Sequence, residues 1–312
     1  MSLSSEPVSI KLSENEVKNG SLSQVNLEIA IRALRRDGLI VVEDLVPHHI
    51  LEALDKKMVK DAYALQAKKN SPYNYNKGNI QQDPLLTDEF FYEEVFLNSI
   101  VTQVTSTSLG PRPSLRFISG NTALPPTADS PPKSQPTHND ADFDHPDIPF
   151  ALVINVPLVT MTPETGSTEI WLGTHANTTI ADQEGAHGDR ASGRIKAAPL
   201  ERRRAERPPS QPVVKKGSII IRDLRLWHGG KPNLTQVPRV MLAMIHFAPW
   251  YRNQMTVEFD SSLEKKLSSA RTNLDMSGAT FVPAAELTKN YLDRPYGNAY
   301  DFSQTDKLEG IF

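Results

Sequence analysis

The stretch Phe150-Ala-Leu-Val-Ile-Asn-Val-Pro-Leu-Val159 is a nearly unbroken run of apolar and β-branched residues, a composition typical of a buried β-strand. Runs of the same kind occur before and after it, at 115–118, 167–172, 218–221 and 240–247. Segments that contain Pro and Gly separate these runs and mark turns. The chain beyond residue 114 is therefore predicted to form a β-sandwich or jelly roll.

Before this β-rich part, the pattern favours helices. Residues 25–36 carry apolar side chains at helical spacing, and basic residues followed by a glycine end the run. A short β-branched strand is predicted at 39–42, and Pro47 is suited to open a helix that continues to Leu65. A further helix is predicted near 89–109. The expected fold class is mainly β with flanking helices.

The domain organisation is predicted to be simple. The polar residues 1–22 are expected to form a flexible N-terminal arm, and 23–312 a single domain. Within it, 176–212 has almost no apolar periodicity and is predicted to be a long loop, either a solvated connector or part of an active-site cover. Three arginines at 202–204 are flanked by acidic residues and are expected to lie on a solvated surface.

Composition excludes several classes of function. The 312 residues include no cysteine, which excludes thiolate catalysis, disulfides, iron–sulfur clusters and cysteine-based zinc sites. The side chains that remain as candidate metal ligands are those of the eight histidines and of Asp and Glu. With 34 Lys+Arg against 37 Asp+Glu, there is no basic field for nucleic acid. Neither a signal peptide nor a long apolar span is found, so we expect a cytoplasmic protein without membrane contact.

The residues that suggest chemistry lie in two separate segments. Gln135-Pro-Thr-His138-Asn-Asp140 holds a His and an Asp two positions apart, which point to the same side of an extended segment. Far downstream, His228 precedes two glycines, and Arg239 lies eleven residues beyond it. Two histidines and one carboxylate make up the facial triad that binds Fe(II) and leaves three coordination positions open.

A second pair, His145-Pro-Asp147, has the same spacing, so spacing alone does not choose between the two. Pro146 restricts the backbone of that segment, which argues against ligation by His145 and Asp147.

Several stretches, in their order and spacing, resemble the phytanoyl-CoA dioxygenase family, and in particular its fungal branch that tailors alkaloids and terpenoid hybrids. They are Gln135 to Asp140, Glu164-Thr-Gly-Ser-Thr168 continuing to Leu-Gly-Thr-His175, Lys216-Gly-Ser-Ile-Ile-Ile-Arg-Asp, His228-Gly-Gly and Arg239. The resemblance extends from about residue 24 to 250. It implies a double-stranded β-helix of the jelly-roll, cupin-like kind, with Fe(II) held by His138, Asp140 and His228.

The resemblance also implies 2-oxoglutarate as co-substrate, together with O2. Arg239 would bind its distal carboxylate, a role that suits the planar and permanently charged fork of an arginine. Gln135 and Thr168 match positions that hydrogen-bond 2-oxoglutarate in relatives of this branch. The chain departs from the family pattern at Ser167 and Thr174, and in a longer connection from His175 to the distal histidine.

The activity that this resemblance implies is an Fe(II)- and 2-oxoglutarate-dependent oxygenase that hydroxylates, desaturates or rearranges a small specialised metabolite and releases succinate and CO2. An acyl-CoA substrate is the alternative within the family. Alternatives of other classes are a non-catalytic metal-binding jelly roll and a hydrolase that uses zinc-activated water. The expected partner is a small-molecule substrate, and a homodimer is left open.

The other histidines and several aromatic residues have weaker assignments. His175 is expected to orient a loop. His246 is expected to face the side of its strand opposite Arg239, and the alternative is that it contacts a metal ligand or the substrate. Exposed positions are expected for His48, His49 and His187. The aromatic candidates for substrate contact, for which packing is the alternative interpretation, are Tyr73, Tyr75, Phe143 and Trp250.

Overall fold

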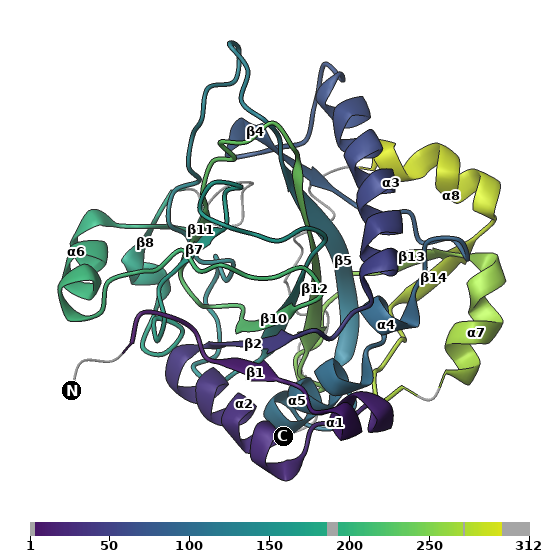
Figure 1. Ribbon diagram of the computed structural model, residues 1–312, viewed down its shortest axis with the longest axis horizontal. Coiled ribbons are helices and arrows are strands. Elements are labelled where there is room, and N and C mark those ends of the chain that lie inside the picture. Colours follow the sequence, from purple (N-terminus) through teal and green to yellow (C-terminus); the bar gives the residue numbers. More distant parts are fainter. Residues whose placement is uncertain (1–3, 186–192, 271, 295–312) are drawn as a thin grey trace, which may run out of the picture.

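One large sheet forms the centre of the computed structural model, which describes residues 4–185, 193–270 and 272–294 (Figure 1). Its strand order is β1-β2-β10-β6-β12-β5-β4-β3, and every neighbouring pair is antiparallel except β1 with β2. The strands are β1 (Ser9–Lys11), β2 (Leu39–Glu43), β3 (Tyr73–Asn74), β4 (Asn76–Gln82), β5 (Ser114–Ala123), β6 (Ala151–Pro157), β10 (Ile219–Asp223) and β12 (Arg239–Phe247).

A smaller sheet lies beside the large one and is held together partly by single-residue pairings. Strand β7 (Thr168–Ile170) pairs with β11 (His228–Gly230), and β8 (Gln183–Glu184) pairs with β9 (Arg194–Ile195). His138 joins these two pairs, because it forms one bridge to His228 and another to Arg194. Residues of both sheets line a shared space, here called the central cavity. Two sheets around a cavity confirm the predicted jelly roll.

The two faces of the large sheet have different partners. Along β12, Arg239, Met241, Ala243 and Ile245 line the central cavity, whereas the intervening side chains belong to the main hydrophobic core. That core also contains residues of the helices α2 (Gln24–Asp37), α3 (His48–Gln66) and α5 (Ser99–Leu109). In Figure 1 these helices lie around the outside of the sheet. The helices therefore support the sheet on one face and leave the other for the site.

The predicted helices and strands agree with the structure, except that the helix expected near 89–109 is divided. A short helix α4 (Glu93–Phe96) ends before Asn98, whose side chain accepts hydrogen bonds from the backbone N–H groups of Ile100 and Val101 and so begins α5. The remaining elements are α1 (Glu14–Asn19), α6 (Ala197–Glu206), β13 (Val257–Asp260), α7 (Glu264–Ser269), β14 (Ala279–Val282) and α8 (Ala284–Asn290). None of the helices in the described ranges is long and apolar enough to cross a membrane.

Two segments contain more regular structure than the sequence suggested. In the expected flexible arm, 1–22, strand β1 pairs with β2, and Ser13 and Glu16 form a capping box that begins α1. In the expected long loop, 176–212, the structure places β8, β9 and α6, while 186–192 lies outside the described residues. The charged side chains of α6 give it no apolar period, so periodicity could not detect this helix.

Candidate metal centre

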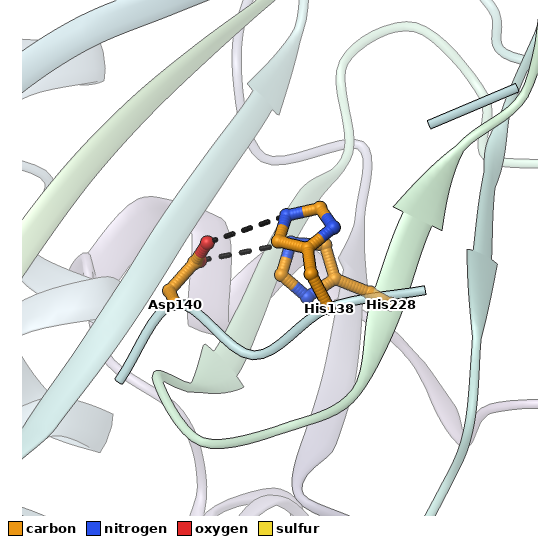
Figure 2. A group of neighbouring side chains, drawn as sticks. All are labelled: His138, Asp140 and His228. Atoms are coloured by element: carbon orange, nitrogen blue, oxygen red, sulfur yellow. Dashed lines mark ion pairs between the residues drawn. The ribbon is translucent and has the colours of Figure 1, made fainter. Parts of the chain in front are cut away.

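Three side chains from two separate segments of the chain, His138, Asp140 and His228, converge beside the central cavity (Figure 2). The Nε2 atom of His138 lies 3.6 Å from Oδ1 of Asp140, and Nε2 of His228 lies 3.6 Å from Oδ2 of the same carboxylate. One ligand atom from each of the three residues can be chosen so that all lie within 4.8 Å of one another. Two imidazoles and a carboxylate at this separation form a donor set for a divalent transition metal.

Hydrogen bonds orient both imidazole rings toward the shared point. Nδ1 of His138 lies 2.9 Å from the carbonyl oxygen of Pro136, and Nδ1 of His228 lies 2.9 Å from that of Leu226. A carbonyl only accepts hydrogen bonds, so Nδ1 carries the proton in each ring, and the Nε2 lone pair is available to a metal.

The backbone fixes the two histidines relative to each other. The N–H of His138 donates to the carbonyl of His228 at 2.8 Å, and the N–H of His228 donates to the carbonyl of His138 at 3.0 Å. The two residues are therefore a hydrogen-bonded antiparallel pair, and their ring centroids are 4.4 Å apart.

The buried Arg222 forms an ion pair with Asp140. Nη2 of Arg222 lies 2.7 Å from Oδ2 of Asp140, and Nε of Arg222 donates to Oδ1 of Asn155 at 3.1 Å. Burial acts to raise the pKa of Asp140, but its interactions with His228, with the guanidinium of Arg222 and with His138 outweigh burial and hold this pKa well below its usual value. Burial also lowers the pKa of His228 to about 3, assisted by Arg222. At neutral pH the site therefore presents a carboxylate and a neutral imidazole, the forms that bind metals.

Arg239 lines the same cavity and is 2% exposed. Its Nη2 donates to the carbonyl of Gly166 at 2.9 Å, whereas Nε and Nη1 are buried and have no hydrogen-bond partner among the described residues. Burial lowers the pKa of Arg239 to about 10, which still leaves the guanidinium charged at neutral pH. A buried cation with unused donors favours an anionic ligand in the cavity.

Gln135 and Thr168 also line the cavity. The side-chain carbonyl of Gln135 accepts a hydrogen bond from the N–H of Gly230 at 2.8 Å, and Gly230 pairs with Thr168 across β11 and β7. A Cβ atom at Gly230 would lie 2.6 Å from the Gln135 oxygen, so a side chain at position 230 would displace the amide of Gln135 from this hydrogen bond.

The second His-x-Asp pair, His145 and Asp147, lies outside the candidate metal centre. Nδ1 of His145 is 3.1 Å from the carbonyl of Pro146, its ring stacks on Phe150, and Asp147 is exposed. Neither His145 nor Asp147 belongs to the cluster of candidate ligands.

The other histidines differ in their surroundings. His246 faces the helices, as its odd offset from Arg239 predicted, with Nδ1 3.0 Å from the hydroxyl of Thr105 on α5. His175 is buried beside Gly38, where a Cβ would meet its ring. The predicted exposure of His48 and His49 is confirmed, and His187 lies outside the described residues.

Of the four aromatic candidates, only Tyr75 reaches the metal centre, where its ring centroid lies 4.9 Å from that of His138. Tyr73 packs in a small apolar cluster, Phe143 packs against Phe150, and Trp250 is 46% exposed. The arginines at 202–204 lie on α6, where Arg202 and Arg204 are exposed as predicted, whereas Arg203 is half-buried and donates from Nη2 to the carbonyl of Leu172 at 2.5 Å.

Sequence reasoning did not single out Arg222 or Asn155. A signal was present for both, because each is a polar residue within a run of apolar residues, Ser-Ile-Ile-Ile-Arg222 and Ala-Leu-Val-Ile-Asn155. A charge in a buried strand requires a partner of opposite sign, which here is Asp140.

Comparison with known proteins relates this arrangement to an established group. The profile of the family described as phytanoyl-CoA dioxygenase matches residues 34–241. EctD from S. alaskensis, solved with 2-oxoglutarate and 5-hydroxyectoine, is similar at 18% identity over 89% of this chain and 93% of that chain, with a TM-score of 0.56.

Two further solved structures are similar to the chain. The epimerase SnoN, in complex with Fe3+, alpha ketoglutarate and nogalamycin RO, has 14% identity over 83% of this chain and 97% of that chain, with a TM-score of 0.55. AviO1 from Streptomyces viridochromogenes Tue57 has 15% identity over 73% of this chain and 98% of that chain, with a TM-score of 0.52. At these low sequence identities, the three comparisons show a similar fold and nothing about the reaction of this chain.

Proposed function

The chain belongs to the phytanoyl-CoA dioxygenase family, and from this premise we propose that it is an Fe(II)- and 2-oxoglutarate-dependent oxygenase of a small specialised metabolite. The observation that carries the proposal is the combination, in one cavity, of a His-Asp-His donor set with a buried arginine that lacks an anion. The ligands in the EctD and SnoN structures support the same cofactors.

His138, Asp140 and His228 would hold the iron. Their donor atoms, nitrogen from neutral imidazoles and oxygen from a carboxylate, suit Fe(II). When bound, Fe(II) and 2-oxoglutarate supply the oxidising power of the reaction, with succinate and CO2 as the products of the co-substrate. The protein's contribution is to fix the ligand atoms through the Nδ1 hydrogen bonds and through Arg222.

Arg239 would bind the distal carboxylate of 2-oxoglutarate. Its unpartnered Nε and Nη1 donors and its permanent charge match a carboxylate, which can accept two hydrogen bonds from a guanidinium. Gln135 and Thr168 would add hydrogen bonds from the small sheet. Because Arg239 is buried, an ion pair between its guanidinium and a carboxylate would be only weakly screened by water.

The proposed substrate is a small specialised metabolite, as in the fungal branch whose motifs this chain resembles. The proposed reaction is hydroxylation, desaturation or oxidative rearrangement. The central cavity supports a small substrate, because its free volume is about 100 Å³.

Anaerobic titration with Fe(II) and 2-oxoglutarate tests the proposal. We expect a visible metal-to-ligand charge-transfer band that is lost in His138→Ala and weakened in Arg239→Ala. His145→Ala is the matched control, because His145 lies outside the ligand cluster, and it should keep the band. A folded, metal-loaded protein that shows no band with 2-oxoglutarate would contradict the oxygenase and favour a structural or hydrolytic metal site.

A further inference from the structure

A row of side-chain amides lies on the wall of the central cavity beside Arg239. Gln81 on β4 is directly opposite Asn121 on β5, and Asn121 is directly opposite Met241 on β12. Met241 is two residues from Arg239, and all four residues line the cavity. Asn74 on β3 lines it as well. We refer to Asn74, Gln81 and Asn121 as the amide wall.

Hydrogen bonds orient two of the three amides. Asn74 donates from Nδ2 to Oε1 of Gln81 at 3.2 Å, and Gln81 donates from Nε2 to the hydroxyl of Ser119 at 2.9 Å. The Nδ2 atom of Asn121 is buried and has no hydrogen-bond partner among the described residues. Because Asn121 also lines the cavity, this donor is available to hydrogen-bond a ligand that enters it.

The amide wall is next to the metal centre. Tyr75 directly follows Asn74, and its ring centroid lies 4.9 Å from that of His138. The φ angle of Tyr75 is +65°, a left-handed conformation that this residue type rarely adopts, and it turns the chain between β3 and β4. The turn thus places the amides and one face of His138 along the same side of the cavity.

The charges of the cavity limit what can bind there. Its charged side chains are Asp140, Arg222 and Arg239 together with the titratable His138 and His228. Asp140 and Arg222 neutralise each other, and the proposed co-substrate uses the charge of Arg239. Beyond the metal centre the lining carries uncharged polar groups, such as those of the amide wall, and apolar side chains, among them Phe117, Val153, Leu224 and Ile245. A charged group on the substrate would therefore find no side chain of opposite sign left unpaired in the described lining of the cavity.

We propose that the amide wall is the substrate-recognition site and that the substrate enters the cavity as an uncharged, mainly apolar body carrying a carbonyl or hydroxyl group, which Asn121 hydrogen-bonds. This inference rests on the proposed function and adds the chemical class of the substrate. An unsubstituted acyl chain does not fit this description of the substrate, because such a chain would leave the amide of Asn121 without a hydrogen-bond partner.

The test uses probes in place of the unidentified substrate. The protein is loaded anaerobically with Fe(II) and 2-oxoglutarate, and the charge-transfer band verifies loading. Binding of cyclohexanone, a neutral ring with one carbonyl, and of cyclohexanecarboxylate, its anionic counterpart, is then measured from the relaxation of the probe protons by NMR. We expect cyclohexanone to bind at least about tenfold more tightly, because the carboxylate would be buried unpaired.

Asn121→Ala should weaken cyclohexanone binding about fivefold, the factor typical of one hydrogen bond, and leave the dissociation constant of 2-oxoglutarate unchanged. The control is Asn273→Ala. Asn273 is exposed and its amide donates to the hydroxyl of Ser106, so this variant should change neither cyclohexanone binding nor the dissociation constant of 2-oxoglutarate.

Equal binding of the two probes, undetectable cyclohexanone binding, or an Asn121→Ala variant that binds cyclohexanone normally would overturn the inference. So would an Asn121→Ala variant that loses 2-oxoglutarate affinity instead, because Asn121 would then belong to the co-substrate site. Absence of the charge-transfer band in the unmodified protein is a separate result, which overturns the proposed function.

Discussion

Arg222 donates a hydrogen bond from Nη2 to Oδ2 of Asp140 at 2.7 Å, and this contact links the candidate metal centre to the large sheet. Asn155 on β6 in turn holds Nε of Arg222. The carboxylate is thus fixed from the large sheet, whereas both imidazoles are fixed from the opposite side of the cavity. The metal centre is therefore assembled across the two sheets.

Replacing Arg222 by Gln should weaken Fe(II) binding by about 10- to 100-fold, the range for partners that orient a metal ligand. Arg222→Lys should recover part of this loss, because it restores the charge but not the planar fork. Anaerobic Fe(II) titration, followed by the charge-transfer band, measures both. Arg225→Gln is the control, since Arg225 is equally buried but pairs with Asp223. An equal loss of iron affinity in this control would mean that the effect of Arg222 is general destabilisation.

The two His-x-Asp pairs predict opposite results for two otherwise similar substitutions. Asp140→Ala should abolish iron binding, because it removes the only carboxylate of the candidate cluster. Asp147→Ala should leave iron binding unchanged, because Asp147 is exposed and outside that cluster. Metal content after dialysis against Fe(II) under anaerobic conditions distinguishes them. Retention in Asp140→Ala with loss in Asp147→Ala would reverse the assignment.

His246 should make the stability of the protein depend on pH. Burial lowers its pKa to about 3, whereas an unfolded chain titrates near 6.5. The unfolded state therefore binds more protons between these values, and stability is lost as pH falls from about 6.5 toward 3, by up to about 1.4 kcal/mol per pH unit. In His246→Gln, which cannot titrate, the free energy of unfolding from urea denaturation should fall less between pH 7 and pH 5. Identical slopes in the two proteins would contradict this role.

Arg207 pairs with Asp37 in the interior, with Nη1 2.8 Å from Oδ1, and the two side chains are 3% and 0% exposed. Arg207→Met should lower the free energy of unfolding by about 2 kcal/mol, because it removes one of the two guanidinium partners of a buried carboxylate, the other being Arg36. Arg32→Met breaks the exposed pair with Glu28 and should cost less than about 1 kcal/mol. Urea denaturation of both variants measures their free energies of unfolding. Similar decreases in the two variants would contradict the expectation that the buried ion pair contributes more to stability than the exposed one.

Much of the fold could be predicted because its central strands carry a strong local signal. The apolar, β-branched runs of β6, β10 and β12 can hardly form anything but buried strands, and the jelly roll expected from them and from the family resemblance is confirmed. The small sheet gives no such signal. Strand β11 is His-Gly-Gly, and the segment at His138 pairs through one residue only, so its pairing depends on tertiary structure.

The candidate site could be predicted in its ligand types but not in its supporting contacts. Motif order led to His138, Asp140, His228 and Arg239, and the structure places all four around one cavity. Their roles as iron and co-substrate ligands remain a proposal. Arg222 and the amide wall depend on which strands are neighbours, and the register of β4, β5 and β12 cannot be read from the separate segments.

The reciprocal backbone hydrogen bonds of His138 and His228 bear on how this protein can change in evolution. Because the two histidines are direct partners across a strand pair, their separation does not depend on how many residues connect them. A change in the length of the chain between them, for example in α6, leaves this pairing itself intact. A one-residue deletion between His138 and Asp140 has the opposite effect, since it turns the carboxylate to the other side of the segment. We therefore expect a change in chain length to cost the metal centre more within residues 138–140 than in α6.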